Sequence, residues 1–424
     1  MRGMRRPLRP TVAAMRWLAL WVLLTGISIS RPLAAQDATT LTVGVPFDDT
    51  VIGQLSERFY RVTPGVGEHL IVVLQKPSGF ASRLDIKFKA MPTDISTDDT
   101  DGGENDGSDQ AVEIGVTKAG DYFIRVRAEC CDVGGSFTIT ALTRSTLPAL
   151  SFGVPVSGDL TSASAERYYR VTLSASQHLF VLLEKPSAFA SRVDINFKSL
   201  PTSANTDASD GGDRDASDQV VEIRLTKAGD YFVRVAAACC DAGGSYTITA
   251  HDLTTLPVLT DGAGIIGNLP RRLAERYYRV PMAAGGELVV NLTKAAPFAA
   301  NLDIKFSQLP TDGDSDASDG GNGLNLTVDI PTTKAGNYFV RVRGACCDAG
   351  GDYTIGTAIL APLTCLGDCT GGNDVTVNEL LTMVNIALGN AQIAACTAGD
   401  ANGDGEITIN ELLVAVSNAL NGCR

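Results

Sequence analysis

The chain has 424 residues, of which 35 are basic and 48 acidic, and its formal net charge is −13. Hydrophobic residues make up 44% of it, so it is long and apolar enough to form several globular domains. The negative charge argues against nucleic acid and anionic membrane surfaces as partners and is compatible with cation binding.

Residues 1–35 are predicted to be a secretory signal peptide. Five arginines between Arg2 and Arg16 precede an apolar run from Trp17 to Ser30, and residues 33–35 (LAA) offer a cleavage site. The run is shorter than the ~18–20 residues of a membrane span, so we expect no span after signal removal. The leader holds six arginines and no acid, so the mature, secreted bacterial protein would carry a charge of about −19.

The segment that follows repeats itself three times. The sequence ERFYRV at 57–62 returns as ERYYRV at 166–171 and at 275–280, a step of 109 residues both times. A unit of this length can bury its own core, so each copy is predicted to be a domain. We place the domains at 41–144, 149–252 and 258–360, joined by short linkers such as 145–148 (STLP). Three copies of one domain are typical of display or spacing.

The pattern inside each repeat predicts strands. Residues 84–89, 193–198 and 302–306 alternate between apolar and polar, which indicates one buried and one wet face. Residues 70–74 are continuously apolar, as in a central strand. Further inward faces are predicted at Val112/Ile114/Val116, Tyr122/Ile124/Val126 and Phe137/Ile139. Seven or eight short strands in ~100 residues favour a two-layer antiparallel sandwich.

The order of these strands, with an AGDYF-x-RV segment near residues 119–126 and 228–235 and AGNYF-x-RV near 335–342, resembles the bacterial pre-peptidase C-terminal domain. That resemblance covers about three quarters of the chain. It implies jelly-roll-like sandwiches with an accessory role in binding, secretion or spacing. The peptidase that such domains accompany is missing here, so no activity is carried over.

The sharpest chemical motif is the twelve-residue segment 400–411 (DANGDGEITINE), which fits an EF-hand calcium loop. Positions 1, 3, 5, 7, 9 and 12 supply oxygen, the seventh through its carbonyl. These are Asp400, Asn402, Asp404, Glu406, Thr408 and Glu411. Gly405 permits the sharp turn at position 6. The expected cofactor is Ca²⁺.

A degenerate copy lies 32 residues earlier, at 368–379. Its corresponding residues are Asp368, Thr370, Asp374, Thr376 and Glu379. Gly372 replaces the acid at position 5 and Asn373 replaces the glycine at position 6, so this site is predicted to bind calcium weakly or only together with the second.

Each loop leads into a predicted amphipathic helix, beginning near Glu379 and Glu411. Two loop–helix units in residues 364–424 resemble a type I dockerin, which implies docking to a cohesin-like scaffold. Dockerins typically carry Asp at position 12 and hydroxyl residues near positions 10 and 11. This chain has Glu379 and Glu411 there, preceded by Val377-Asn378 and Ile409-Asn410, so the fold carries over better than the partner.

Ten cysteines in an exported chain favour disulfides. Each repeat has one adjacent pair, for which a vicinal disulfide locking a turn is the economical prediction and a redox switch the alternative. The pairs are Cys130–Cys131, Cys239–Cys240 and Cys346–Cys347. Three connectivities are open to the other four, and we prefer Cys365–Cys423 with Cys369–Cys396.

Each repeat also has an acidic, glycine-rich stretch, at 97–103, 207–212 and 316–321. A solvated loop is the preferred interpretation, and a calcium site is the alternative. Catalysis has little support. The three histidines, His69, His178 and His251, are interpreted as incidental strand or linker residues, and no hydrolase or phosphate-binding motif occurs.

The sequence therefore predicts a mainly β protein of three tandem antiparallel sandwiches and a small α-helical EF-hand/dockerin-like domain. Its expected function is non-catalytic: display, adhesion or spacing, with calcium-dependent docking to a protein, matrix or cell-surface ligand. The rivals are an accessory subunit of a polysaccharide- or protein-degrading assembly, an adhesin, and an enzyme with an unrecognised site.

Overall fold

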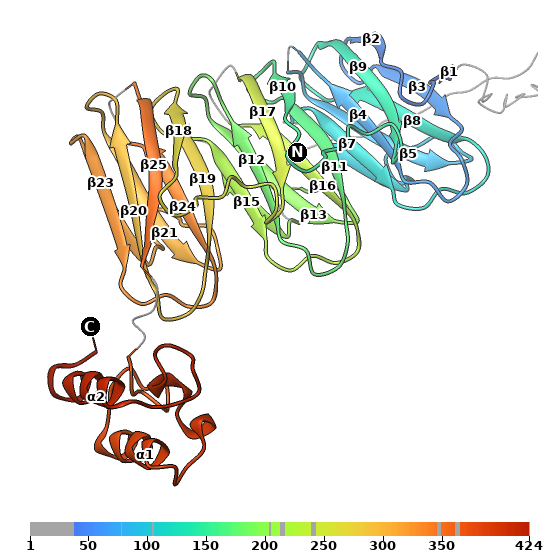
Figure 1. The fold of residues 1–424 in the computed structure, drawn as a ribbon. Helices are drawn as coiled ribbons and strands as arrows, with labels where there is room; N and C mark the ends of the chain where they lie inside the picture. The colour runs from blue at the N-terminus through green and yellow to red at the C-terminus, as the bar shows by residue number, and fades with distance from the viewer. Residues whose placement is uncertain are drawn as a thin grey trace, which may run out of the picture. The chain divides into compact units, whose positions relative to one another are not determined.

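The structure is a computed structural model that describes residues 38–423, except 78, 104–105, 203–204, 213–216, 239–242, 346–348 and 361–364. The predicted signal peptide lies outside the described residues. Among the residues described, no helix is long and apolar enough to cross a membrane. The fold is mainly β, as predicted, with two α-helices in the described part of the chain (Figure 1).

Repeat 1 has nine strands. They are β1 Thr39–Thr40, β2 Phe47–Ile52, β3 Glu57–Val62, β4 Leu70–Gln75, β5 Ser82–Phe88, β6 Asp99–Gly102, β7 Gln110–Ile114, β8 Tyr122–Ala128 and β9 Gly134–Thr143. Repeat 2 has β10 Val156–Leu160, β11 Glu166–Leu173, β12 Leu179–Glu184, β13 Ser191–Phe197, β14 Ala208–Gly211, β15 Gln219–Ile223, β16 Gly229–Ala237 and β17 Gly244–His251. Repeat 3 has β18 Gly264–Leu269, β19 Glu275–Met282, β20 Glu287–Lys294, β21 Ala300–Phe306, β22 Ala317–Gly321, β23 Asn325–Ile330, β24 Gly336–Gly344 and β25 Gly351–Leu360.

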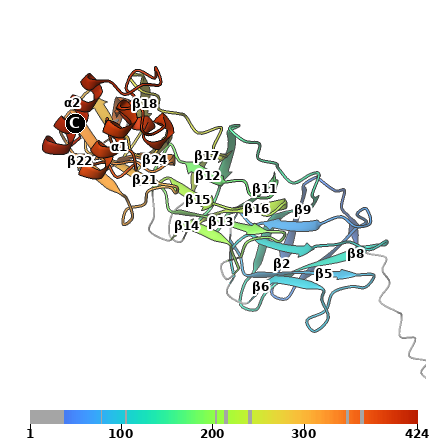
Figure 2. The same ribbon diagram turned by 60° about the horizontal axis from the view of Figure 1, so that its bottom comes forward.

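Each repeat folds into two antiparallel sheets with one topology. In repeat 1 the orders are β2-β9-β4-β7 and β3-β8-β5-β6, and β1 adds a parallel edge strand beside β3. Repeats 2 and 3 have the same orders shifted by eight strands. Figure 2 shows the layer of β5, β6 and β8 in repeat 1. Eight strands in this order form a jelly roll.

The core of each repeat lies between its two sheets. In repeat 1, Leu70, Val72 and Leu74 of β4 face Ile86 of β5 and Ile124 of β8, all fully buried. Equivalent clusters fill repeats 2 and 3. The period-two pattern of the strands thus selects the inner residues, as expected. One predicted inward residue is wrong: Val116 lies beyond the end of β7 and is 71% exposed.

The outer side of β5 is not wet as the alternation predicted. Asp85, between two core residues, is completely buried, and its carboxylate pairs with Arg125 at 2.7 Å. The same pair recurs as Asp194–Arg234 and Asp303–Arg341, each at 2.8 Å. A buried carboxylate requires such a partner, and the pairs hold the strands of one sheet together.

The C-terminal residues 365–423 form a small helical module. It contains α1 Val377–Ala387, α2 Ile409–Asn421 and two short 3₁₀ turns, Ile393–Ala395 and Thr397–Gly399. Its core includes Val375 and Ile407, each at position 8 of one predicted loop, together with Met383 and Ala415 from the two helices. Each helix therefore packs against both loops through a shared interior.

Candidate functional site

In the second predicted calcium loop, the backbone curls around the carboxylate of its first residue. The carboxylate of Asp400 accepts hydrogen bonds from the N–H groups of Gly403 at 2.8 Å and Gly405 at 2.8 Å. Both glycines have positive φ, +71° and +87°, so they allow the chain to curl around that carboxylate. The side chains of Asn402 and Asp404 lie next to one another at 2.7 Å and are exposed.

Glu411, at position 12, also caps a helix. Thr408 is the N-cap of α2, and the two residues form a capping box, in which the Glu411 carboxylate accepts the Thr408 N–H at 2.6 Å. It also accepts the N–H of Ala401 at 2.8 Å. The backbone N–H of Thr408 is the main cause that lowers the pKa of Glu411. The Thr-x-x-Glu spacing therefore has a structural explanation that the sequence analysis missed.

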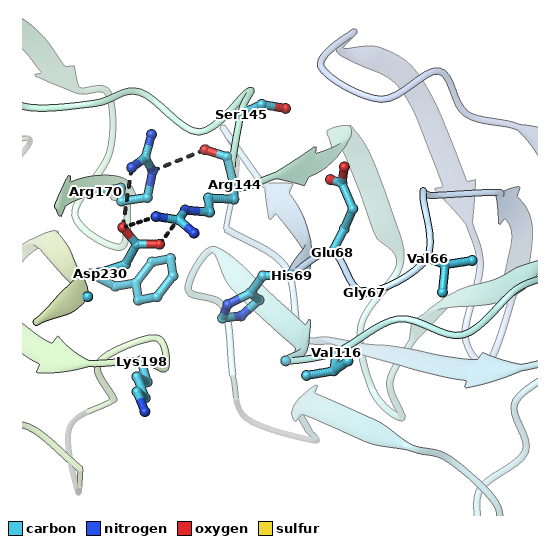
Figure 3. Close-up of a pocket in the computed structure, with 13 residues that line it drawn as sticks. Val66, Gly67, Glu68, His69, Val116, Arg144, Ser145, Arg170, Lys198 and Asp230 are labelled. Atoms are coloured by element: carbon cyan, nitrogen blue, oxygen red, sulfur yellow. Dashed lines mark hydrogen bonds and ion pairs between the residues drawn. The ribbon is translucent and has the colours of Figure 1, made fainter.

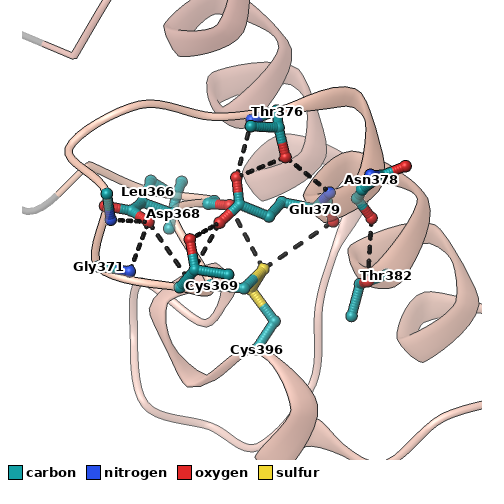
Figure 4. The surroundings of a disulfide bond; sticks show 12 residues. Leu366, Asp368, Cys369, Gly371, Thr376, Asn378, Glu379, Thr382 and Cys396 are labelled. Carbon is teal, nitrogen blue, oxygen red and sulfur yellow. Dashed lines mark hydrogen bonds between the residues drawn. A yellow bond between two sulfur atoms is a disulfide. The ribbon is translucent and has the colours of Figure 1, made fainter.

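The degenerate first loop has the same arrangement (Figure 4). Asp368 accepts the N–H groups of Gly371 at 2.7 Å and Asn373 at 2.7 Å, and Asn373 adopts the positive φ of +61° that glycine takes in the second loop. Thr376 and Glu379 repeat the capping box of α1. The hydrogen bond from the Thr376 N–H lowers the pKa of Glu379 to about 2.

The donor set of the second loop fits calcium. It brings hard oxygens from Asp400, Asn402, Asp404 and Glu411 to one loop–helix unit, and each carboxylate oxygen that accepts one N–H keeps a further lone pair. Among the described residues, no group of three or more His, Cys, Asp or Glu side chains is already gathered around a metal position. The loop thus has the right ligand types, with its carboxylates currently bonded to backbone N–H groups.

Both helices carry apolar residues on their exposed side as well as on their buried side. Met383 and Ile386 of α1 and Ala415 of α2 face the core of the module. Four further apolar residues on each helix, at i, i+4, i+7 and i+11, are 39–78% exposed. They are Val377, Leu381, Val384 and Leu388 on α1, and Ile409, Leu413, Val416 and Leu420 on α2. The two exposed stripes match position by position at a spacing of 32 residues.

The structure pairs Cys365 with Cys423 and Cys369 with Cys396, which is the connectivity that the sequence analysis preferred. In repeat 1 the sulfur atoms of Cys130 and Cys131 lie 3.0 Å apart, which is longer than a disulfide bond, so the vicinal disulfide stays a prediction. Cys131 has a φ of +75°, which marks a tight turn. The other two adjacent pairs, at 239–240 and 346–347, lie outside the described residues.

The acidic stretches are not solvated loops, which corrects the preferred interpretation. Each contains a strand, β6, β14 or β22, that pairs with the preceding strand of its repeat. In repeat 1, Asp101 accepts the N–H of Ala111 at 2.8 Å and Asp99 accepts that of Glu113 at 2.7 Å. These carboxylates join β6 of one sheet to β7 of the other, so their role is structural.

Consecutive repeats pack against one another through the outer faces of their sheets. Each repeat has two sheets, each with an outer face. We call the outer face of the sheet that contains β4 (β12 in repeat 2, β20 in repeat 3) the trailing face. The outer face of the sheet that contains β3 and β8 (β11 and β16, or β19 and β24) is the leading face. Ile71 and Val73 on the trailing face of repeat 1 contact Tyr168 and Phe232 on the leading face of repeat 2. The equivalent cluster between repeats 2 and 3 contains Phe180, Tyr277 and Phe339.

Buried polar groups complete each junction. Asp109 accepts the N–H of Lys76 in its own repeat at 2.6 Å and that of Glu166 in the next at 3.0 Å. Asp218 makes the same two bonds to Lys185 and Glu275. A shared carboxylate thus ties the backbones of two repeats together. The sequence analysis missed it because nothing distinguishes this aspartate from its acidic neighbours.

His69 and His178 are also junction residues, not incidental ones. His69 lies 2.8 Å from Glu113, which in turn accepts the N–H of Leu200 in repeat 2. His178 lies 2.6 Å from Glu222, which accepts the N–H of Leu309 in repeat 3. Repeat 3 has Glu287 at this position. The occurrence of histidine in the first two repeats alone was the sequence signal for this role.

Acidic cavities of about 310 Å³ and about 420 Å³ lie at the two junctions. Burial raises the pKa of Glu166 to about 7 in the first and that of Glu275 to about 7 in the second. Each of these glutamates hydrogen-bonds a tyrosine, Tyr168 or Tyr277, and pairs with an arginine. Each junction therefore contains one glutamate, Glu166 or Glu275, whose burial favours its protonated form.

A larger groove of about 890 Å³ lies beside the first junction (Figure 3). Its arginines, Arg144 and Arg170, both point to Asp230, at 2.6 Å and 3.3 Å. Asp230 of repeat 2 thus pairs with both arginines of this groove. Leu253 replaces Arg144 and Asn337 replaces Asp230 at the second junction, so these ion pairs are not repeated there, and we assign the groove no ligand.

Comparison with known proteins identifies one domain type in this fold. Residues 274–344, in repeat 3, match the family described as the bacterial pre-peptidase C-terminal domain. This match supports the resemblance seen in the sequence. No curated protein matches the chain.

Several solved structures are similar to parts of the chain. The pre-peptidase C-terminal domain of a collagenase from Bacillus anthracis is 14% identical, over 24% of this chain and 93% of that one, with a TM-score of 0.20. The triple jelly roll protein of an archaeal virus is 8% identical, over 75% and 89%, with a TM-score of 0.19. The CUB1-EGF-CUB2 region of human MASP-1/3 is 10% identical, over 48% and 99%, with a TM-score of 0.17. At these TM-scores we base no conclusion on them.

Proposed function

We propose that the chain is a secreted, non-catalytic, calcium-binding protein. Three sandwiches of the pre-peptidase C-terminal type form its spacer or display portion, and an EF-hand pair at residues 364–424 binds Ca²⁺ and docks to a partner. The observation that carries the proposal is the loop–helix unit 400–421, whose oxygen donors have the identity and order of an EF-hand.

The residues that would hold the ion are Asp400, Asn402 and Asp404 by their side chains, Glu406 by its carbonyl, and Glu411. Bound calcium would offset two of the three carboxylate charges and connect the loop to the first turn of α2. Thr408 already caps α2, so its hydroxyl would act through a water molecule. The first loop has one carboxylate fewer and would bind more weakly.

Native mass spectrometry of the non-reduced mature protein, with calcium and after chelation, tests this proposal. We expect one or two bound ions and, for Glu411→Gln, a loss of calcium affinity of at least tenfold. Glu406→Gln is the matched control, because only the backbone carbonyl at position 7 is a ligand, and its affinity should stay within about twofold. An unchanged affinity in Glu411→Gln, or no bound calcium in the wild type, would contradict the assignment.

The exposed stripes of α1 and α2 favour a second candidate, a dockerin-like accessory subunit of an extracellular polysaccharide- or protein-degrading system. A helix with apolar residues on both faces is normally covered, and eight of them are open to solvent here. We expect the whole chain to retain a cohesin-type protein in a calcium-dependent pull-down, and Leu381→Asp with Leu413→Asp to abolish retention. Retention by the double variant, or none by the wild type, would rule this candidate out.

A further inference from the structure

Among the described residues, the surfaces that join the repeats are used twice, which leaves one leading face and one trailing face that no described repeat covers. The leading face of repeat 1 and the trailing face of repeat 3 are these two surfaces. Because the repeats are related by sequence, each can be compared residue by residue with counterparts whose partner is known. The comparison shows that the trailing face of repeat 3 is polar, whereas the leading face of repeat 1 keeps the docking residues.

The trailing face of repeat 3 has lost the docking residues. Glu287 and Asn291 stand where repeat 1 has His69 and Val73, whereas Val289 keeps an apolar side chain at the position of Ile71. Asn325 replaces Asp109, and the N–H of Lys294 bonds to the Leu324 carbonyl instead of to an aspartate. The side chains of Asn291 and Asn325 are exposed. This face is polar and closed to further stacking, like the capping unit of a repeat array.

The leading face of repeat 1 has kept the docking residues. Phe59, Met91 and Phe123 stand where repeat 2 has Tyr168, Leu200 and Phe232. Arg58 donates to the Glu57 carbonyl at 3.2 Å, as Arg167 and Arg276 donate to Glu166 and Glu275. The arrangement that receives a neighbouring repeat is therefore complete.

The polar residues of this face are more exposed than their counterparts, whereas Phe123 is 6% exposed. The Glu57 side chain is 33% exposed, whereas its counterparts Glu166 and Glu275 are 13% and 6% exposed beneath the preceding repeat. Arg58 is 42% exposed, against 23% for Arg167, which pairs with Asp109 of the preceding repeat. The difference corresponds to the contacts that Asp109 and Asp218 supply at the internal junctions.

We propose that the leading face of repeat 1 docks the trailing face of a β-sandwich domain of the same type on a different polypeptide. That partner presents apolar residues at alternate outer positions of one strand, as Ile71 and Val73 do. It also presents a carboxylate, placed like that of Asp109, which accepts the N–H of Glu57 and pairs with Arg58. A second copy of this chain does not qualify, because two of its trailing faces are covered and the third is polar.

The test restores the lost docking residues in the full chain. In Asn291→Val/Asn325→Asp, and in the fuller set that adds Glu287→His, the third repeat gains a face that fits repeat 1 of another molecule. Such a head-to-tail contact does not close on itself, so open-ended oligomers should form. We expect the weight-average sedimentation coefficient to rise with protein concentration for the variants and to stay constant for the wild type.

Adding Phe59→Asp and Met91→Asp to the same variants should return them to monomers. Circular dichroism and melting identify variants that keep the wild-type fold. A correctly folded graft that stays monomeric overturns the proposal, and so does association that survives the Phe59 and Met91 changes. Wild-type oligomers that Phe59→Asp removes would identify a second copy as the occupant and overturn the assignment to another polypeptide.

Discussion

At the scale of single residues, several side chains have two structural or functional roles. Glu411 is a candidate calcium ligand and also the N3 residue of the α2 capping box, and Glu379 does the same for α1. Asp109 accepts the N–H of Lys76 in its own repeat and also that of Glu166 in the next. Substitutions at such positions therefore need controls that separate the two roles.

The capping role predicts a local loss of stability. Thr408→Ala removes the side chain that accepts the Glu411 N–H, which costs about 1 kcal/mol for an N-cap threonine. Hydrogen exchange of the amides in α2 should accelerate roughly fivefold. Thr408→Ser is the control, because it keeps the hydroxyl, and it should exchange like the wild type. Equal exchange in all three proteins would contradict the capping role.

The buried glutamates of the junctions predict a pH dependence. The pKa of Glu166 and Glu275 is raised from 4.5 to about 7 by burial, so the folded protein keeps protons that the unfolded chain has released between these values. Stability from these groups is therefore greatest below pH 4.5, falls as the pH rises to about 7, and is constant above it.

Glu166→Gln/Glu275→Gln should flatten this dependence, because glutamine does not titrate. We expect the difference in melting temperature between pH 5 and pH 8 to shrink by several degrees, with the gain at pH 8. Glu57→Gln, at the equivalent exposed position of repeat 1, is the control and should leave the pH profile as it is. A double variant with the wild-type profile would show that these carboxylates do not titrate as argued.

At the scale of elements, the same strand has different surroundings in different repeats. Both faces of β4 are buried, the inner one in its own core and the outer one against repeat 2. The inner face of β20 is buried, but its outer positions are polar or partly exposed. β4 is an interior strand between β9 and β7, as predicted, and its continuous apolarity in residues 70–74 also reports the neighbouring repeat.

This contrast predicts that polar substitutions on the outer faces of β4 and β20 change the free energy of unfolding by different amounts. Val73→Asn places in repeat 1 the residue that repeat 3 has at this position, and it should lower the free energy of unfolding by about 1–3 kcal/mol, because an amide would be buried in the junction. Val289→Thr on the partly exposed outer side of β20 should change it by less than about 0.5 kcal/mol. Urea unfolding measures both values, and equal effects would argue against the junction.

At the scale of the whole molecule, the sandwiches and the C-terminal module are held together by different means. Each sandwich has a core of about twenty buried apolar side chains. The module has seven, two of which are cysteines of the two disulfides that close segments of 58 and 27 residues. By chain entropy, such bridges contribute about 4 kcal/mol each, so the module depends on them far more than the sandwiches do.

Reduction should therefore unfold one part of the protein and spare the other. We expect hydrogen-exchange protection to be lost across residues 365–423 under reducing conditions without calcium, while the strands of all three repeats keep theirs. Cys365→Ser/Cys423→Ser should reproduce part of this loss without any reductant. Protection that persists throughout the module after reduction would show that its small core suffices.

The sequence by itself determined the number of repeats, their β class and the two loop–helix units, because these follow from local periodicity and spacing. It also contained the correct cysteine pairs of the module. Only the tertiary structure decided that the acidic stretches are strands, that His69 and His178 belong to junctions, and that Glu379 and Glu411 cap helices. Each of these depends on which surface meets another, and residues that touch across a junction lie as far apart in sequence as Asp109 and Glu166.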